Sequence, residues 1–486
     1  MSTATAVPAQ EAPVTAPIVS WRAPIGLGVL AIASTVTFGI FAGTKNAAFG
    51  LVDTGREAST LAAWLAFAVA LVAAGWLGAV WFRDQRAGRP TARWVPPALA
   101  AAVVVFVLAV LGVAGVTTIT VNSPVIGWIA SLVMLAVAAW SAWLAPRGRR
   151  LPRWAVAAFA VAFVVGFLVW IVAGGRDATP FISLAGLLAG AVTLAVPLVF
   201  GSLSGVLCER SGIVNIAIEG QLLMGAFTAA VAATVTGSVY AGLVAAAVAG
   251  ALVSLVLAVV SIKYLVNQII VGVVLNVLVV GLTNFLFSTL LTANPDGLNK
   301  PPHLGSVEIP VLADVPLIGP ILFRQSLVGY LMYIAVIVVY VGLFHTRWGL
   351  RVRAVGEHPQ AADTLGVNVN RTRFWNTILG GAVAGVGGSF FTLVAVDAFS
   401  KEMSAGRGYI ALAALIFGRW NPIGAFLASL LFGFADNLQS VITIIGSPVP
   451  SQFMAMLPYV VTVFAVAGLV GRSRPPAMEG IPYVKG

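Results

Sequence analysis

Charged side chains are scarce in this sequence: they make up 9% of the 486 residues, whereas apolar residues make up 60%. Water-soluble proteins usually carry about 25% charged residues, so this chain has too few to cover a surface that faces water. The high apolar content also excludes a disordered chain, and the absence of a strict glycine period excludes a collagen-like fibre. These absences leave a polytopic integral membrane protein.

Residue types that support chemistry are also rare. Cys208 is the single cysteine, so no intrachain disulfide forms, and we interpret it as a small buried hydrophobe. The three histidines, His303, His345 and His358, are far apart in the chain, and no pattern with metal-ligand spacing or nucleophile–base pairing occurs. We therefore expect no metal site and no catalytic residue, which argues against a membrane enzyme.

The formal net charge of +11 comes from 27 basic and 16 acidic residues. The basic residues lie scattered between apolar runs, which argues against a nucleic-acid partner. Arginines gather in four places, at 83–93, 147–153, 347–373 and 472–474, and the opposite loops are balanced or acidic. Because loops rich in Lys and Arg stay in the cytoplasm, this pattern predicts that both termini are cytoplasmic.

Long apolar runs dominate what the sequence does contain. About 20 apolar residues in a helix cross the hydrocarbon core of a membrane, which is about 30 Å thick. A shorter run, 408–418, indicates a re-entrant half-helix. We predict an all-α, polytopic membrane helical bundle of about 13 spans plus this half-helix. The spans are expected at 24–43, 60–82, 95–117, 126–145, 154–174, 182–207, 217–236, 240–262, 267–291, 328–344, 374–396, 423–441 and 453–471.

The arginine-rich loop 345–373 contains signals for a short helix. Pro359 occupies the position of a first helical residue, and Gly366 that of a C-terminal stop. The residues alone leave two interpretations open: an ordinary charged inner loop, or a docking helix that inserts into a cytoplasmic partner.

Four stretches carry a resemblance to a known family. They are GLRVRAVGEHPQAADTLGVNVNR (349–371), LAVPLVFGSLSGVLCERSGIVNIAIEGQLLMGAFTAA (194–230), NQIIVGVVLNVLVVGLTNFL (267–286) and MSAGRGYIALAALIFGRWNPIGAFLASLLFGFADNLQ (403–439). With these stretches in this order and at this spacing, the chain resembles ABC-importer permeases of the ribose, nucleoside and branched-chain amino-acid group. It is most similar to the nucleoside and simple-sugar subgroup. The resemblance covers about 180–475.

The resemblance implies a domain organisation, partners and a docking loop. It implies an N-terminal extension of about five spans at 1–175, a permease core at 176–475 and a cytoplasmic tail at 476–486. It further implies a bacterial plasma-membrane location, an ABC ATP-binding subunit on loop 345–373, a second permease subunit in a heterodimer, a substrate-binding lipoprotein outside and surrounding membrane lipid. The residues expected to dock the ATPase are Arg353, Gly356, Glu357, Pro359, Ala362, Asp363 and Gly366.

The resemblance also implies transport driven by ATP. The chain has no G-x-x-x-x-G-K-[ST] sequence, the loop that cradles phosphates in P-loop NTPases. We therefore expect that this chain binds no cofactor and that ATP is used by the partner subunit, whose motion would open the cavity to alternate faces of the membrane.

Polar residues inside apolar runs are the candidates for a substrate path. A charge at the bilayer centre costs about 2.5–3.5 kcal/mol on insertion scales. A charged or polar residue within a span is therefore expected to have a structural or a functional role. A span broken near Gly212 would let polar groups face a central cavity, although hydrogen bonding between helices is the structural alternative. The predicted path residues are Asn215, Glu219, Gln221, Asn276 and Asn284.

Two other classes of function remain open from the sequence. An ion-coupled secondary transporter would use Glu219, Asp397 or Asp436 to carry protons or sodium ions. A non-transporting membrane scaffold would move no solute at all. Transport in proteoliposomes distinguishes these classes.

Overall fold

The computed structural model describes residues 21–41, 46–50, 71–72, 76, 79, 118–149, 151–174, 181–310, 312–313, 315, 318–445, 456 and 475–484. The chain divides into two compact units. Among the described residues, the first unit contains those up to 49, those from 119 to 182, and Ile445. The second contains those at 50, 71–72, 76, 79, 118 and 456, those from 183 to 444, and those from 475 to 484.

The first unit is a small group of apolar helices with a short sheet. The strands run in the order β2 (Thr118–Asn122), β1 (Asn46–Gly50), β3 (Phe181–Ser183). The Asn122 side chain caps the following helix by accepting a hydrogen bond from the Val125 backbone N–H. The helices are α1 (Arg22–Ser34), its π-helical continuation η1 (Thr35–Ile40), α4 (Ser123–Leu144), the short 3₁₀ turn η2 (Ala145–Arg147) and α5 (Arg153–Ala173).

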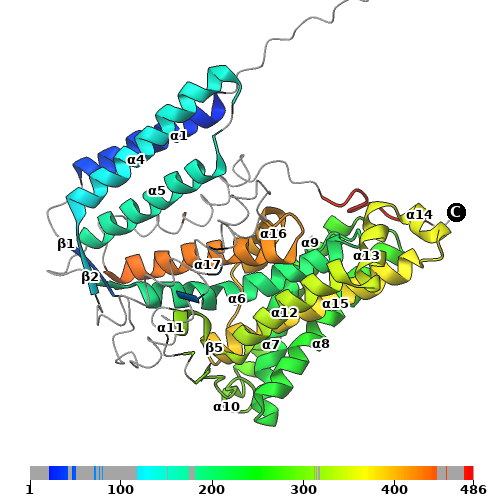
Figure 1. The fold of residues 1–486 in the computed structure, drawn as a ribbon. Helices are drawn as coiled ribbons and strands as arrows, with labels where there is room; N and C mark the ends of the chain where they lie inside the picture. The colour runs from blue at the N-terminus through cyan, green and yellow to red at the C-terminus, as the bar shows by residue number, and fades with distance from the viewer. Residues whose placement is uncertain are drawn as a thin grey trace, which may run out of the picture. The chain divides into compact units, whose positions relative to one another are not determined.

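The second unit contains the longer series of helices, shown in Figure 1. A small antiparallel hairpin pairs Ser306 with Ser326 between its β4 and β5 strands. The elements are α6 (Leu184–Glu209), α7 (Ile218–Thr236), α8 (Val239–Ala258), η3 (Val259–Lys263), α9 (Gln268–Leu286), η4 (Phe287–Leu291), α10 (Pro295–Leu298), β4 (Ser306–Glu308), α11 (Ile318–Leu322), β5 (Arg324–Ser326), α12 (Leu327–His345), α13 (Arg347–Glu357), α14 (Pro359–Thr364), α15 (Val369–Phe390), η5 (Phe391–Ala395), α16 (Arg407–Phe417) and α17 (Pro422–Ile445).

The all-α membrane bundle is confirmed. Among the described residues, ten helices are long and apolar enough to cross a membrane, and each coincides with a predicted span. The predicted spans 60–82, 95–117 and 453–471 lie almost wholly outside the described residues. The predicted half-helix is α16, whose 11 residues rise about 16 Å, roughly half the thickness of a membrane core.

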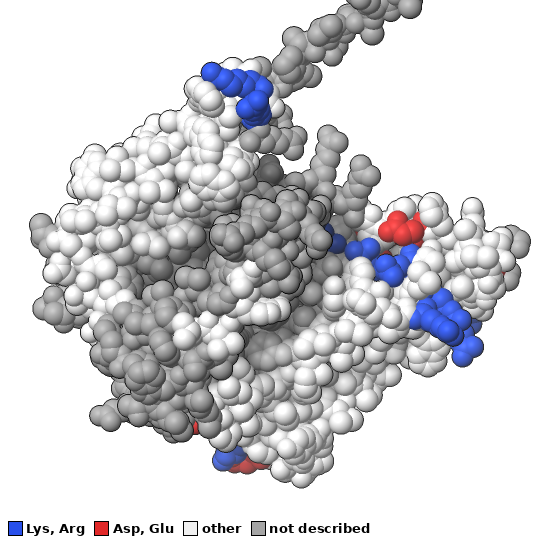
Figure 2. Space-filling view, in the orientation of Figure 1, with Lys and Arg blue, Asp and Glu red and all other residues white. Residues whose placement is uncertain are grey.

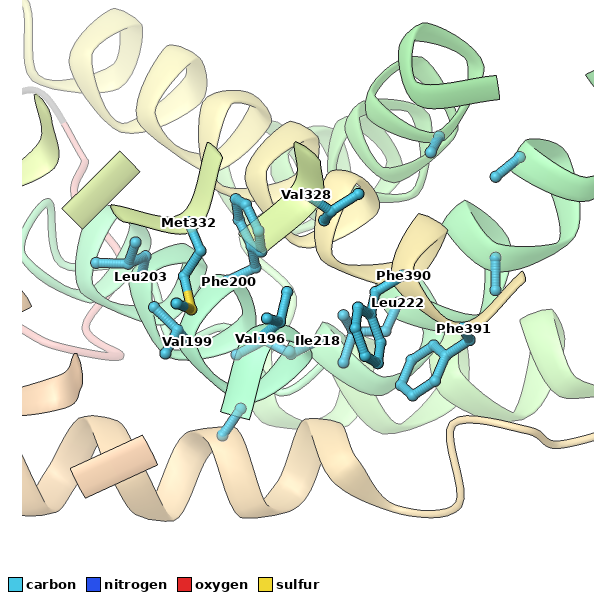
Figure 3. Packing of buried hydrophobic residues seen from close by; sticks show 14 of the residues in the cluster. Val196, Val199, Phe200, Leu203, Ile218, Leu222, Val328, Met332, Phe390 and Phe391 are labelled. Atoms are coloured by element: carbon cyan, nitrogen blue, oxygen red, sulfur yellow. The ribbon is translucent and has the colours of Figure 1, made fainter. Parts of the chain in front are cut away.

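Helix α6 lies at the centre of the second unit, and most of its side chains are buried. Its core residues pack against α7, α12 and α15 (Figure 3). Complete burial of each large apolar side chain contributes about 1.5–3 kcal/mol where water is the reference solvent; within a membrane, close packing takes that role. The residues labelled in this part of the core include Val196, Val199, Phe200, Leu203, Ile218, Leu222, Val328, Met332, Phe390 and Phe391.

Glycines bring three helices into backbone contact. A Cβ atom on Gly385 of α15 would lie 2.0 Å from the Ala246 carbonyl oxygen of α8, and one on Gly388 would lie 2.0 Å from the Leu222 carbonyl oxygen of α7. Small residues at such crossings permit the close approach from which membrane helices gain their packing energy. The glycine-rich stretch of α15 is therefore a packing surface.

On the visible face of the second unit, charged groups lie near its ends. Figure 2 shows its Lys, Arg, Asp and Glu side chains near opposite ends of the visible face, with a wide uncharged surface between them. One end carries α13, α14 and the C-terminal end of the chain (Figure 1); we refer to it as the α13–α14 end. An uncharged belt between polar ends is the surface that a protein within a bilayer requires.

Candidate functional site

A break in the helical chain follows α6. The helix ends at Glu209, the next begins at Ile218, and Gly212 between them has φ +96°. That left-handed conformation favours glycine because it has no Cβ. Freed backbone groups find side-chain partners: the Val214 N–H donates to Gln268 Oε1 at 2.7 Å. The break is thus held by tertiary contacts.

Two of the predicted path residues form a buried amide network beside this break. Gln221 Nε2 donates to Asn215 Oδ1 at 3.0 Å and to Ser254 Oγ at 2.7 Å, and Asn215 Nδ2 donates to Gln221 Oε1 at 3.1 Å and to Ser204 Oγ at 3.0 Å. All four side chains are fully buried. The network connects α6, α7 and α8, and the place of Asn215 and Gln221 in a substrate path remains a prediction.

The Glu219 carboxylate holds the loop that precedes the half-helix. Its Oε1 accepts from Ser404 Oγ at 2.6 Å and from the Gly406 N–H at 2.8 Å, and its Oε2 accepts from the Gly408 N–H at 2.6 Å. Three donors are what a buried carboxylate needs to compensate for lost hydration. Ser404 was not predicted from the sequence; the small residues Ser404, Ala405, Gly406 and Gly408 are the signal that could have indicated this contact. Whether Glu219 lies on a substrate path remains a prediction.

Asn276 joins α9 to both the break and the half-helix. Its Oδ1 accepts from the Gly220 N–H at 2.8 Å, and its Nδ2 donates to the Ile216 carbonyl at 2.9 Å and to Tyr409 Oη at 3.2 Å. The Tyr409 side chain belongs to α16 and is half exposed. Asn276 therefore fixes a junction at which one aromatic ring remains accessible.

Asn284 lies two turns further along α9 and reaches the same stretch of chain, 402–409. Its Nδ2 donates to Glu402 Oε1 at 3.2 Å. Its Oδ1 is buried and has no hydrogen-bond partner among the described residues. An unpaired buried acceptor is costly, so a ligand hydroxyl or N–H would gain a hydrogen bond there.

The histidines contact separate groups. His303 Nδ1 lies 2.6 Å from Asp397 Oδ1, and the His345 ring lies 5.4 Å from the Tyr340 ring centroid. In the part of the chain that the structure describes, no three His, Cys, Asp or Glu side chains come close enough to hold a metal ion. A separate ion pair, Arg407 to Asp436 at 3.2 Å, connects the half-helix to α17.

The predicted docking loop contains two helices instead of one. The short helix that the sequence predicted begins at Pro359 and is α14. The preceding α13 was not expected, although its signals are readable: Thr346 Oγ1 caps it by accepting from the Gly349 N–H at 3.1 Å, and Val352 and Val355 share its buried face. Arg351 and Arg353, interleaved with Val352, obscured that pattern.

The predicted docking residues separate by burial. Gly356, Pro359 and Ala362 are buried, and a Cβ on Gly356 would lie 2.3 Å from the Arg210 carbonyl oxygen. These buried residues pack the two helices against the rest of the second unit. The exposed edge of α14 carries Gln360, Ala361 and Thr364 and continues into Leu365, whose surface is 84% exposed. Direct contact of the predicted residues with an ATPase remains a prediction.

The tail expected from 476 onward is packed against these helices. We name the described residues 475–484 the C-terminal strap. The Met478 N–H donates to the Gly356 carbonyl at 3.0 Å, and the Gly480 N–H to the Gly212 carbonyl at 3.1 Å. Arg373 Nη1 of α15 donates to the Ile481 carbonyl at 2.8 Å. The strap therefore bonds to α13, to α15 and to the break after α6.

Glu479 adds an acidic contact to the strap. Its carboxyl group forms a hydrogen bond with Glu209, and burial raises the pKa of Glu479 above its ordinary value, with nearby Arg210 opposing that change. Two carboxyl groups form such a bond only when one of them holds a proton. Attachment of this part of the strap is therefore favoured at lower pH.

Comparisons with known proteins identify the family of this chain. The nucleoside ABC transporter permease protein NupC of Lactococcus lactis subsp. cremoris is 39% identical over 308 residues, which are 62% of this chain and 96% of that protein. The guanosine ABC transporter permease protein NupQ of Bacillus subtilis is 38% identical over 309 residues, 60% of this chain and 94% of that protein. No solved structure matches the chain. A family described as the permease component of branched-chain amino acid transport systems matches residues 187–466, and the chain therefore belongs to it.

Proposed function

We propose that this chain is the permease subunit of an ATP-driven ABC importer that moves nucleosides across a bacterial plasma membrane. The observation that carries the proposal is the similarity to the two nucleoside and guanosine permeases along 96% and 94% of their lengths. The family match at 187–466 extends over the break, the half-helix and the two helices of the docking loop.

In this proposal, the ATPase binds the exposed edge of α14. The α13–α14 end contains Arg347, Arg351 and Arg353, so the positive-inside rule places it, with both chain termini, on the cytoplasmic side. The sequence contains no P-loop motif, and ATP hydrolysis is therefore assigned to the separate subunit. This chain binds no cofactor and catalyses no reaction itself.

The outer face of α9 is assigned to the second permease subunit of a heterodimer. Several of its large apolar side chains are more than half exposed, and polar groups lie beside them at 402–409. A substrate-binding lipoprotein would deliver the nucleoside at the end opposite α13 and α14. The exposed apolar residues of α9 are Ile270, Val274, Val277, Leu278 and Phe285.

The substrate path is assigned to the strip formed by Asn284, Glu402 and Tyr409. A nucleoside is neutral and offers hydroxyl and N–H donors with a flat base. The unpaired Asn284 Oδ1 accepts such a donor, and the accessible Tyr409 ring offers an aromatic surface. Because such a path carries few charges, it favours the passage of a neutral solute over transport coupled to ions.

The function is tested by uptake of radiolabelled guanosine into proteoliposomes that contain the permeases, the ATPase and the binding protein. We expect uptake that requires ATP and continues when ionophores collapse the ion gradients. A catalytically inactive ATPase is the control. Uptake that needs no ATPase and stops with the ion gradient would instead establish a secondary transporter, and no uptake under either condition would favour a scaffold.

Asn284→Ala tests the substrate path. We expect the half-saturating guanosine concentration to rise about fivefold, because one hydrogen bond contributes about 1 kcal/mol, while ATPase copurification stays unchanged. Ser288→Ala is the matched control: its exposed hydroxyl bonds to the Asn284 carbonyl within the same helix, and uptake should remain normal. Equal saturation curves for wild type and Asn284→Ala would remove this residue from the path.

A further inference from the structure

The C-terminal strap contacts several of the segments around the docking helices. Besides its bonds to Gly356, Gly212 and Arg373, the Ala477 N–H donates to Glu357 Oε2 at 3.2 Å. The side chain of Tyr483 packs on Val355, Ala362 and Val369 and hydrogen-bonds to Asp363. A segment of ten residues thus connects α6, α13, α14 and α15.

The strap adds to the bonds that hold α14 within its own loop, such as that from the Val367 N–H to the Ala362 carbonyl. Helix α14 has six residues, and a helix this short is not stable alone in water. Its buried side is small, since only Pro359 and Ala362 turn inward. The Tyr483 side chain packs against the small buried cluster to which Ala362 belongs.

The strap also connects to the segments whose motion would open the bundle. Gly212 lies in the break after α6, and a Cβ on it would lie 2.7 Å from Arg373 Nη2 and 3.1 Å from the Met478 carbonyl oxygen. Arg373 is 1% exposed, and its Nε and Nη2 have no hydrogen-bond partner among the described residues. Its guanidinium group therefore lies between the break and the strap. A displacement of either segment would also move the other.

We propose that the C-terminal strap is a coupling element: it positions α13 and α14 and transmits their displacement to α15 and to the break between α6 and α7. The proposal rests on the proposed function, because it assumes that an ATPase moves the docking helices. The strap acts on transport through other residues and contacts neither substrate nor ATP. It therefore affects the efficiency with which hydrolysis is converted into uptake, and leaves docking intact.

The experiment compares the full chain with a chain that ends after Arg474, each assembled with the ATPase, the second permease and the binding protein. We expect the truncated chain to insert and to retain the ATPase, whereas guanosine uptake per ATP hydrolysed falls about tenfold. Stimulation of hydrolysis by the loaded binding protein should be lost as well. A chain that ends after Val484 keeps the strap and is the matched control.

Point variants keep the test decisive if the truncated chain does not insert. Tyr483→Ala removes the ring that packs against the cluster containing Ala362 and should reduce uptake per ATP, whereas Tyr483→Phe keeps the ring and should behave almost as wild type. Unchanged uptake per ATP in Tyr483→Ala or in the truncated chain would overturn the proposal. Loss of ATPase copurification would also overturn it, because the strap would then be a docking surface. Failure of the full chain to couple ATP to uptake would instead refute the proposed function.

Discussion

Gly385→Leu is expected to prevent correct folding of the membrane bundle. A Cβ alone at this position would lie 2.0 Å from the Ala246 carbonyl oxygen and 3.1 Å from the Gly250 Cα. The obstructing atoms belong to the backbone of α8, so relief requires the helices to separate. Overpacking in an interior typically costs about 1–3 kcal/mol even where side chains can move, and a leucine against a fixed backbone should exceed that range.

The measurement is the yield of monodisperse protein in mild detergent, together with its thermal unfolding midpoint. Gly281→Leu is the matched control, because Gly281 lies in α9 and a Cβ there meets no heavy atom within 4 Å. Leucine is a better helix former than glycine by somewhat under 1 kcal/mol, so the control should unfold at the same or a slightly higher temperature. A normal yield and midpoint for Gly385→Leu would show that α8 and α15 do not make this contact.

Leu365→Asp is expected to abolish copurification of the ATPase while the permease folds normally. The side chain is 84% exposed, so its replacement leaves the core intact. In the proposed complex it would insert into the ATPase, where an unpaired carboxylate loses hydration without compensation. Anchor residues of this kind contribute about 2 kcal/mol or more, which corresponds to an affinity at least about 30-fold weaker.

The measurement is the amount of ATPase retained on the tagged permease over a concentration series, with the unfolding midpoint determined in parallel. Val307→Asp adds the same charge at another exposed apolar residue, in the β4–β5 hairpin, and should retain the ATPase fully. Equal retention by the two variants would exclude the tip of α14 as the docking contact, and a lowered midpoint for Leu365→Asp alone would assign the residue to folding.

Much of the fold was predictable because membrane insertion imposes a simple rule on the sequence. A helix that crosses the hydrocarbon core needs about 20 apolar residues, and ten of the predicted runs are helices of this kind among the described residues. The same reasoning identified α16 as too short to span. Proline at 359 and glycine at 366 sufficed to predict α14, because each acts on its own backbone.

The partners of the polar residues were not predictable, because they are distant in the chain. Glu219 binds the loop at 404–408, about 185 positions away, and Asn276 binds Tyr409, 133 positions away. Sequence position identified these residues as unusual for a membrane span. It left open whether they face a cavity or bond to one another, and the structure shows that Asn215 and Gln221 bond to each other within a closed network.

The sequence by itself determined that this chain is a membrane bundle with a short helix that begins at Pro359, because hydropathy and helix punctuation are local properties. Tertiary structure alone decided the connections around the half-helix. Asp397, Glu402, Ala405, Arg419 and Trp420 have positive φ there, a conformation that their own side chains disfavour. Contacts from elsewhere hold these flanking segments: Glu219 binds 404–408, and Glu209 accepts a hydrogen bond from Trp420. Tertiary structure also decided the packing of the C-terminal strap, because its hydrogen bonds connect residues more than 100 positions apart.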